Sequence, residues 1–184
     1  MMTTTLSRLR RDDTLLFLID VQERLVPAIH NHEQVVTNCA TLVAAANQLQ
    51  LPIIVTEQYP EKLGGTVAAI VEAAPLAPIS KMRFSACTDE TMQAIAATER
   101  KTVLVCGIEA HVCVLQSTLD LIENGFTVFV ALDAISSRRE ENKQFAWERM
   151  RAAGVVAAST ESAIFELLGE AGTPDFKAML RLIK

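Results

Sequence analysis

The sequence has no apolar run long enough to cross a bilayer, although half of its 184 residues are hydrophobic. Its first residues, MMTTTLSRLRRDD, include basic side chains, but Asp12 and Asp13 interrupt the stretch before the apolar core of a secretory signal could follow. Charged residues make up only 21% of the chain, a composition that excludes the disordered class. We therefore expect a soluble protein of the cytoplasm that makes no contact with a membrane.

The chain also lacks the charge of a nucleic-acid-binding protein. Its net charge is −5 and its pI is near 5.2. Lysine and arginine are scattered, apart from a short cluster at Arg8, Arg10 and Arg11 that a solvated terminus explains. Proteins that bind nucleic acid carry a basic patch or stripe. We expect no nucleic-acid partner.

No two cysteines form a C-x-x-C pair, which excludes a thioredoxin-type redox motif and a zinc ribbon. The segment CVLQSTL also lacks the arginine, six residues after cysteine, that a thiol phosphatase needs to bind phosphate. Cytosolic cysteines are normally reduced, so all four are expected to be free thiols. They are Cys39, Cys87, Cys106 and Cys113.

Short aliphatic runs alternate with longer amphipathic segments, a pattern typical of parallel strands joined by helical crossovers. The runs predict strands at 15–19, 53–56, 77–80, 102–106, 127–131 and 155–157. The amphipathic segments predict helices at 33–49, 88–98, 111–124, 140–153, 161–168 and 174–183. Residues 59–78 are the one long irregular stretch, predicted as a loop with a short helix. The sequence therefore predicts an α/β fold, a three-layer α/β/α sandwich, in a single domain over residues 1–184.

Three chemically active side chains follow predicted strands. Asp20 ends the stretch LLFLID, Lys81 follows APIS, and Cys113 lies in the turn after VLVCG. In an open parallel sheet, ligands bind outside the carboxyl ends of the strands. We expect the three side chains to share one site.

These three residue types suit nucleophilic chemistry. A free thiol has a pKa of ~8.5, and both a helix N-terminus and a nearby cation favour the thiolate. Cys113 is predicted in the first turn of a helix that begins near His111, with Lys81 as the cation. Asp20 could accept the thiol proton and return it to a leaving group. The expected site contains a nucleophile, a base and a cation.

Each residue also has an ordinary explanation. A strand-end aspartate is often a cap or a turn residue, a lysine is usually solvated, and a cysteine is often a small buried hydrophobe. Packing explains Cys39 and Cys106, and nothing visible activates Cys87. A dinucleotide-binding domain is a further option by fold, but DVQERL follows the first strand in place of G-x-G-x-x-G.

Three blocks carry a resemblance to a known family. LIDVQ with Asp20, SKMRFS with Lys81 and CGIEAHVCV with Cys113 resemble, in order and spacing, the blocks of the isochorismatase-like cysteine hydrolase superfamily. The resemblance covers nearly the whole chain and is most similar to the isochorismatase-domain-containing subgroup. It implies a six-stranded parallel sheet of order 3-2-1-4-5-6 and a catalytic triad of Cys113, Asp20 and Lys81.

The same resemblance implies further details of the site. The peptide bond between Ile108 and Glu109 is expected to be cis, and the backbone N–H groups of Glu109 and Cys113 are expected to form an oxyanion hole. The implied reaction is attack of the thiolate on a small amide or related carbonyl compound, through a thioester intermediate. Two alternatives stay open: isochorismatase-type ether hydrolysis, and a catalytically inactive scaffold or interaction protein of the same fold.

One departure from nicotinamidases, which are relatives within this superfamily, concerns the metal. They carry a D-x-H motif and a further histidine, where this chain has TEQYP. The three histidines, at positions 30, 32 and 111, form no H-x-x-x-H helix face. We expect no metal and no cofactor, which argues against nicotinamide as the small-molecule substrate. The candidates for pocket walls are Gln22, Glu57, Tyr59, Phe84 and His111.

The C-terminal segment DFKAMLRLIK places Phe176, Met179, Leu180 and Ile183 at helical spacing. The simplest interpretation of this apolar stripe is that it packs on the protein's own sheet. Proteins similar to this one commonly form homo-oligomers that close the mouth of the active site. We therefore expect a homo-oligomer.

Overall fold

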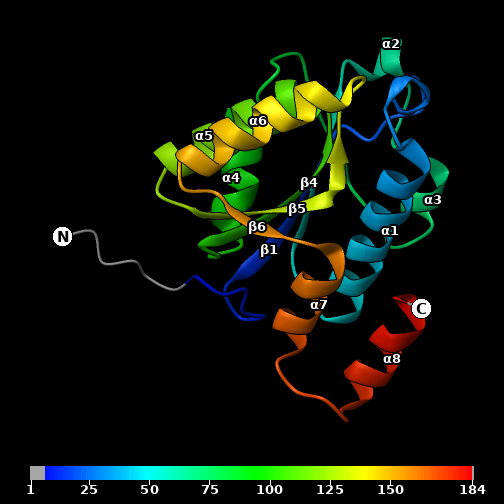
Figure 1. Cartoon of the computed structure of the whole chain (residues 1–184), viewed down its shortest axis with the longest axis vertical. Coiled ribbons are helices and arrows are strands. Elements are labelled where there is room, and N and C mark those ends of the chain that lie inside the picture. Colours follow the sequence, from blue (N-terminus) through cyan, green and yellow to red (C-terminus); the bar gives the residue numbers. More distant parts are fainter. Residues whose placement is uncertain (1–6, 184) are drawn as a thin grey trace.

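The computed structural model describes residues 7–183, and its centre is a six-stranded sheet (Figure 1). The strands are β1 (Thr14–Ile19), β2 (Ile53–Gln58), β3 (Ile79–Lys81), β4 (Thr102–Ile108), β5 (Thr127–Ser136) and β6 (Val156–Ala158). All neighbouring strands are parallel, and the order β3-β2-β1-β4-β5-β6 confirms the expected topology. Because β1 lies between β2 and β4, its carboxyl end is flanked by the carboxyl ends of these two strands.

Helices cover both faces of the sheet, as the alternating pattern predicted. They are α1 (His32–Gln48), α2 (Pro60–Leu63), α3 (Ala68–Val71), α4 (Asp89–Ala97), α5 (Leu115–Glu123), α6 (Glu140–Ala152), α7 (Thr160–Leu168) and α8 (Pro174–Leu182), with a 3-10 turn η1 at Val26–Ala28. In Figure 1, α4, α5 and α6 lie on one side of the sheet, and α1, α7 and α8 lie on the other. The three-layer sandwich is therefore confirmed.

The central strand β1 shows why a continuous apolar run was needed. All six of its residues are buried. Leu16 and Leu18 face the core under α1 and α7, while Leu15 and Phe17 face the core under α4 and α5. Successive side chains of a strand point to opposite faces, so a strand covered on both sides must be apolar throughout.

β5 and the helix expected over 111–124 differ most from the sequence-based prediction, and the other strands differ by one or two residues at their ends. β5 runs to Ser136 and does not end at residue 131, because the pairing shifts from Val105↔Val130 to Gly107↔Ile135 and the strand bulges between these pairs. The helix expected over 111–124 is a π-helical turn, η2 (Ala110–Val114), followed by α5. Single π turns often lie at functional sites.

The irregular stretch 59–78 contains two short helices, α2 and α3, where one was expected. The terminal helix α8 packs on the protein's own core: Met179 is fully buried, and the Phe176 ring lies 6.4 Å from the ring of Phe165 in α7. Within residues 7–183, no helix combines the length and apolarity that a membrane span requires.

Candidate active site

Asp20 is the first residue after β1 and is fully buried. Its backbone is left-handed, with φ of 53°, a conformation that aspartate tolerates better than most residues. Its backbone N–H donates to the Thr56 carbonyl at 3.1 Å, and the Thr56 hydroxyl donates to Asp20 Oδ1 at 2.8 Å. Both contacts come from β2, so the end of that strand fixes the direction of the carboxylate.

Lys81, at the end of β3, reaches Asp20 across the intervening β2. Its Nζ lies 2.6 Å from Asp20 Oδ2, and both side chains are wholly buried. The same ammonium donates to Gln58 Oε1 at 2.7 Å, to the Arg83 carbonyl at 3.1 Å and to the Phe84 carbonyl at 3.2 Å. The length of the lysine side chain, with these acceptors around its end, brings two non-adjacent strand ends into one site.

Gln58 is a site residue that the sequence analysis missed. It ends β2 opposite Lys81, and its side-chain amide accepts from Lys81 and donates to the Met82 carbonyl at 2.9 Å. In the sequence, Gln58 is part of TEQYP, the stretch that stands where nicotinamidases carry a metal motif. The available signal was its position two residues after the strand predicted at 53–56.

Gly107 lets β4 approach β1 beside the site. Its φ is 123°, and an added Cβ would overlap the carbonyl oxygen of Ile19, the residue before Asp20. A glycine is therefore required where the two strands end. The chain continues through a cis peptide bond between Ile108 and Glu109 into η2, which carries Cys113.

Cys113 is 6% exposed and lies within the electrostatic influence of Asp20 and Lys81. The pKa of its thiol is raised to about 12, first by burial and then by the charge of Asp20, and the charge of Lys81 opposes this rise. Lys81 therefore favours the thiolate, as the sequence predicted, but burial and the charge of Asp20 keep the thiol pKa above its ordinary value. The sequence showed the cation, but it could not show that burial and the neighbouring carboxylate outweigh it.

Burial also raises the pKa of Asp20, and the charge of Lys81 lowers it by less. Within the described residues, Asp20 Oδ2 accepts no well-directed hydrogen bond despite the close ammonium. A carboxylate with a raised pKa is a better proton acceptor than an ordinary aspartate. The arrangement is a neutral thiol beside a buried base, which a cation holds in place.

Gln22 and Glu57 hold the segment that follows β2. The Gln22 amide donates to the carbonyls of Gln58, at 2.9 Å, and Gly64, at 2.7 Å, and accepts from the Gln58 N–H at 2.7 Å. Glu57 Oε1 accepts from the N–H and the hydroxyl of Thr66, both at 2.7 Å. These contacts give both side chains a structural task in addition to any contact with substrate.

The other pocket candidates lie nearer the surface. Tyr59 is 37% exposed and Phe84 is 58% exposed. His111 is half-buried, and its Nδ1 lies 2.9 Å from the Ser137 hydroxyl. The Glu109 carboxylate accepts from the Arg138 backbone N–H and guanidinium, both at 3.1 Å. The Glu109 side chain is therefore tied to the segment before α6.

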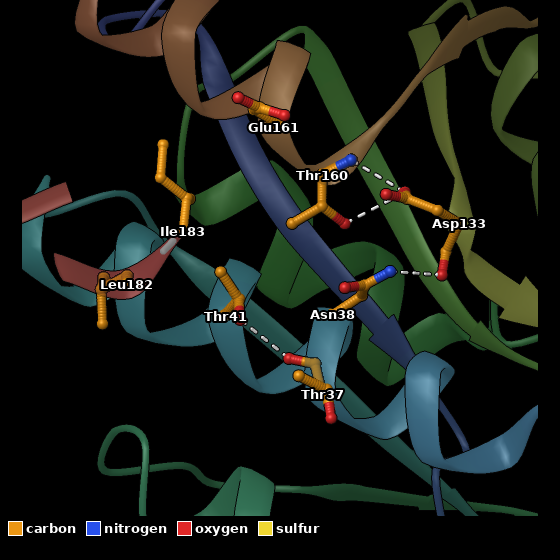
Figure 2. A pocket seen from close by; sticks show the side chains of 8 residues that line it. All are labelled: Thr37, Asn38, Thr41, Asp133, Thr160, Glu161, Leu182 and Ile183. Carbon is orange, nitrogen blue, oxygen red and sulfur yellow. Dashed lines mark hydrogen bonds between the residues drawn. The ribbon is translucent and has the colours of Figure 1, made fainter. Parts of the chain in front are cut away.

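Among residues 7–183, no three His, Cys, Asp or Glu side chains form a group that could hold a metal ion. A cavity of about 330 Å³ lies between α1, β5, α7 and the C-terminal residues, and none of the triad residues lines it (Figure 2). There the Thr160 N–H and hydroxyl donate to Asp133 Oδ1 at 2.8 and 3.0 Å, and Asn38 donates to the Asp133 carbonyl at 2.7 Å. These contacts pair the polar groups of the cavity with one another.

Comparison with known proteins adds the family context. Residues 14–162 match the model of the isochorismatase domain. The secreted isochorismatase effector Isc1 of Phytophthora sojae is 42% identical, over 99% of this chain and 90% of its own. Isochorismatase domain-containing protein 2A of Mus musculus is 38% identical, over 98% of this chain and 87% of its own.

Two solved structures have the same fold over almost the full length. The MAR1 ribonuclease of Caenorhabditis elegans superposes with a TM-score of 0.91 at 39% identity, covering 96% of this chain and 92% of its own. The YcaC protein of Escherichia coli, described as an octameric hydrolase of unknown specificity, superposes with a TM-score of 0.90 at 26% identity, covering 98% and 92%.

Proposed function

The chain belongs to the isochorismatase family, and from that premise we propose that it is a cysteine hydrolase acting on a small amide or related carbonyl compound. The observation that carries the proposal is the buried ion pair of Asp20 and Lys81, 2.6 Å apart, whose charges both act on the Cys113 thiol. Burying two charges costs desolvation free energy, and apolar side chains of similar volume are often at least as stabilising. The buried pair therefore indicates a chemical role. Beside a thiol, that role is proton transfer.

In the proposed reaction, Cys113 gives its proton to Asp20 as the sulfur attacks the substrate carbonyl carbon. The oxygen takes the electron pair of the carbonyl bond, and the backbone N–H groups of Glu109 and Cys113 are the proposed donors to this oxyanion. When the carbonyl reforms, the C–N bond breaks and the leaving nitrogen takes the proton from Asp20. A thioester on Cys113 remains.

Water completes the cycle. Asp20, again a carboxylate, accepts a proton from the water molecule that attacks the thioester, and the acid product leaves as the C–S bond breaks. The proton returns to the Cys113 sulfur. Lys81 keeps its proton throughout and holds the Asp20 carboxylate in place. General acid–base catalysis of this kind contributes ~100- to 10,000-fold to a rate.

Two other activities have support from relatives. The name of Isc1, which is 42% identical, favours isochorismatase-type ether hydrolysis, and the name of MAR1 favours ribonuclease activity. Ether hydrolysis does not need a thiol, and the chain carries a net charge of −5 without a long basic stripe. The small amide therefore remains our first proposal, and an inactive scaffold would leave the triad without a role.

Turnover and covalent trapping test the proposal together. The protein is incubated with a panel of small amides, with isochorismate and with RNA. Amine or acid release is measured, and acyl adducts are mapped by peptide mass spectrometry. We expect an amide to be cleaved and Cys113→Ser to abolish cleavage. Cys39→Ser is the matched control, because Cys39 is also a buried thiol but lies in the core on the other face of the sheet, where it donates to the Ala134 carbonyl. Turnover that survives in Cys113→Ser would overturn the proposal.

We further propose that the protein forms a homo-oligomer, acts on a small molecule and needs no metal. The octamer of YcaC supports the first point, and the chemistry of the triad supports the third because it contains its own base and cation. Sedimentation velocity measures the assembly, and turnover after treatment with EDTA tests the metal. The cytoplasmic location stays a prediction, and the relative Isc1 is named as secreted.

A further inference from the structure

We propose that Ser117 is a positioning residue that fixes the Cys113 turn against the loop holding Lys81. The inference rests on the proposed function, because it concerns how the triad of that function is assembled. Ser117 lies in α5, one turn after Cys113, and is fully buried. No motif in the sequence singles it out as a site residue.

The Ser117 hydroxyl connects two segments. It donates to the Cys113 carbonyl at 2.6 Å and accepts from the Ala86 backbone N–H at 2.7 Å. A serine that donates to the carbonyl four residues earlier is common in helices. The bond from Ala86 is the unusual part, because Ala86 lies 31 residues away in sequence, in the loop after β3.

The same loop holds the catalytic lysine. The carbonyls of Arg83 and Phe84 accept from Lys81 Nζ at 3.1 and 3.2 Å. A chain of short contacts therefore runs from the Cys113 carbonyl through Ser117 and residues 83–86 to the Lys81 ammonium. Moving one end of this chain moves the nucleophile relative to the cation.

A second link joins the same two segments. The Ser85 hydroxyl donates to the Asp120 carboxylate of α5 and accepts from the Cys87 N–H at 3.2 Å. The Cys87 thiol donates to the Ser117 carbonyl at 3.5 Å. All of these groups are buried or half-buried. Ser117 contacts both the Cys113 backbone and the loop directly, and the Ser85 link supports the same separation.

Thr118 offers a matched control. It is the next residue of α5, is also fully buried, and its hydroxyl donates to the Leu115 carbonyl at 2.9 Å. No contact of its hydroxyl reaches the loop after β3 within the part of the chain that the structure describes. Thr118→Val thus removes a buried hydroxyl from the same helix without touching the proposed link.

The test is a double-mutant cycle in which the reactivity of the Cys113 thiol is measured without any substrate. The rate of alkylation of Cys113 by iodoacetamide is measured from pH 7 to 10 by peptide mass mapping. The variants are Ser117→Ala and Thr118→Val, each with Lys81 and with Lys81→Met, and all are first shown to be folded by circular dichroism. The charged groups acting on the thiol are Asp20, after β1, and Lys81, at the end of β3.

We expect Ser117→Ala to slow alkylation of Cys113 about tenfold when Lys81 is present, because small displacements at a site cost rate steeply. In the Lys81→Met background the same change should have no further effect, since Ser117 acts through the position of Lys81. Thr118→Val should leave the rate unchanged, and Ser117→Thr, which restores the hydroxyl, should recover it. An equal effect of Ser117→Ala in both backgrounds would show a general structural role and overturn the inference.

The failure of the inference and the failure of the proposed function give different results. If Lys81→Met alone leaves the alkylation of Cys113 unchanged, the triad is not coupled and both are overturned. If Lys81→Met slows alkylation but Ser117→Ala matches Thr118→Val, only the inference is overturned. Should Ser117→Ala not fold, Ser85→Ala removes the second link from the same loop. An unchanged rate of Cys113 alkylation in Ser85→Ala would then overturn the inference.

Discussion

Lys81 Nζ lies 2.6 Å from Asp20 Oδ2, and no part of either side chain is exposed. Desolvation of two charges is repaid only where further hydrogen bonds complete the pair. Here the Thr56 hydroxyl donates to the carboxylate, and Gln58 accepts from the ammonium. Removing one partner leaves the other charge buried and uncompensated, which makes the pair a sensitive point of the fold as well as of the site.

Lys81→Met should lower the free energy of unfolding at pH 7 by ~3–5 kcal/mol, the cost of breaking a buried pair. Urea denaturation measures the loss. The control is Asp175→Asn, which breaks the exposed ion pair of Arg11 and Asp175, 2.8 Å long, and should cost less than ~1 kcal/mol. Equal losses of unfolding free energy in the two variants would show that the buried ion pair contributes no more to stability than the exposed one.

Asp20→Asn should separate thiol reactivity from turnover. The charge of Asp20 raises the pKa of Cys113, so a neutral amide should lower that pKa and speed alkylation by iodoacetamide at a fixed pH near 8. Turnover should fall by ~100-fold or more, because the proton acceptor is lost. Kinetics of alkylation and of amide cleavage on the same preparation check both parts. Slower alkylation in Asp20→Asn would contradict the electrostatic account of the site.

Stability should fall at alkaline pH through buried thiols, among them Cys113 and Cys87. In the folded state the pKa values of Cys113 and Cys87 are raised from 9.0 to about 12, so the unfolded chain loses these protons first. The stabilisation is complete below pH 9 and is lost as the pH rises from 9 towards 12, by up to ~1.4 kcal/mol per pH unit for each thiol. Urea denaturation between pH 8 and 11 measures the slope.

Single variants assign that slope. Cys113→Ser and Cys87→Ser should each make the loss of stability above pH 9 less steep, because each removes one titrating group. An unchanged slope in both variants would mean that neither thiol has a raised pKa in the folded protein.

Gly107→Ala should destabilise the protein by about 3 kcal/mol, because it combines a left-handed backbone with overpacking against the Ile19 carbonyl. Gly154→Ala is the control: its φ is 97°, but no atom lies within 4 Å of an added Cβ. It should cost only the backbone part, about 1–2 kcal/mol. Urea denaturation of both variants compares them, and equal losses would show that the close approach of β4 to β1 is not tight.

Much of the fold was predictable because its signals are local. The buried run at 15–19 and the amphipathic segment at 33–49 report their own periodicity, and β1 and α1 lie within one residue of those bounds. Parallel strand ends meet at one edge, so Asp20, Lys81 and Cys113 could be assigned to one site from their places after strands. β5 was predicted too short, because its extension past residue 131 depends on pairing with β4 across a bulge.

The sequence by itself determined the strands, the order of the chemical blocks and the three residues that follow strand ends, because these depend on neighbours along the chain. Only the tertiary structure decided that Gln58 accepts from Lys81, that Ser117 accepts from the Ala86 N–H and that burial raises the pKa of Cys113. Hydrogen bonds between distant segments, and the balance of burial against two opposite charges, depend on distances in space. Those distances exist only once β1, β2, β3 and β4 have assembled into one sheet.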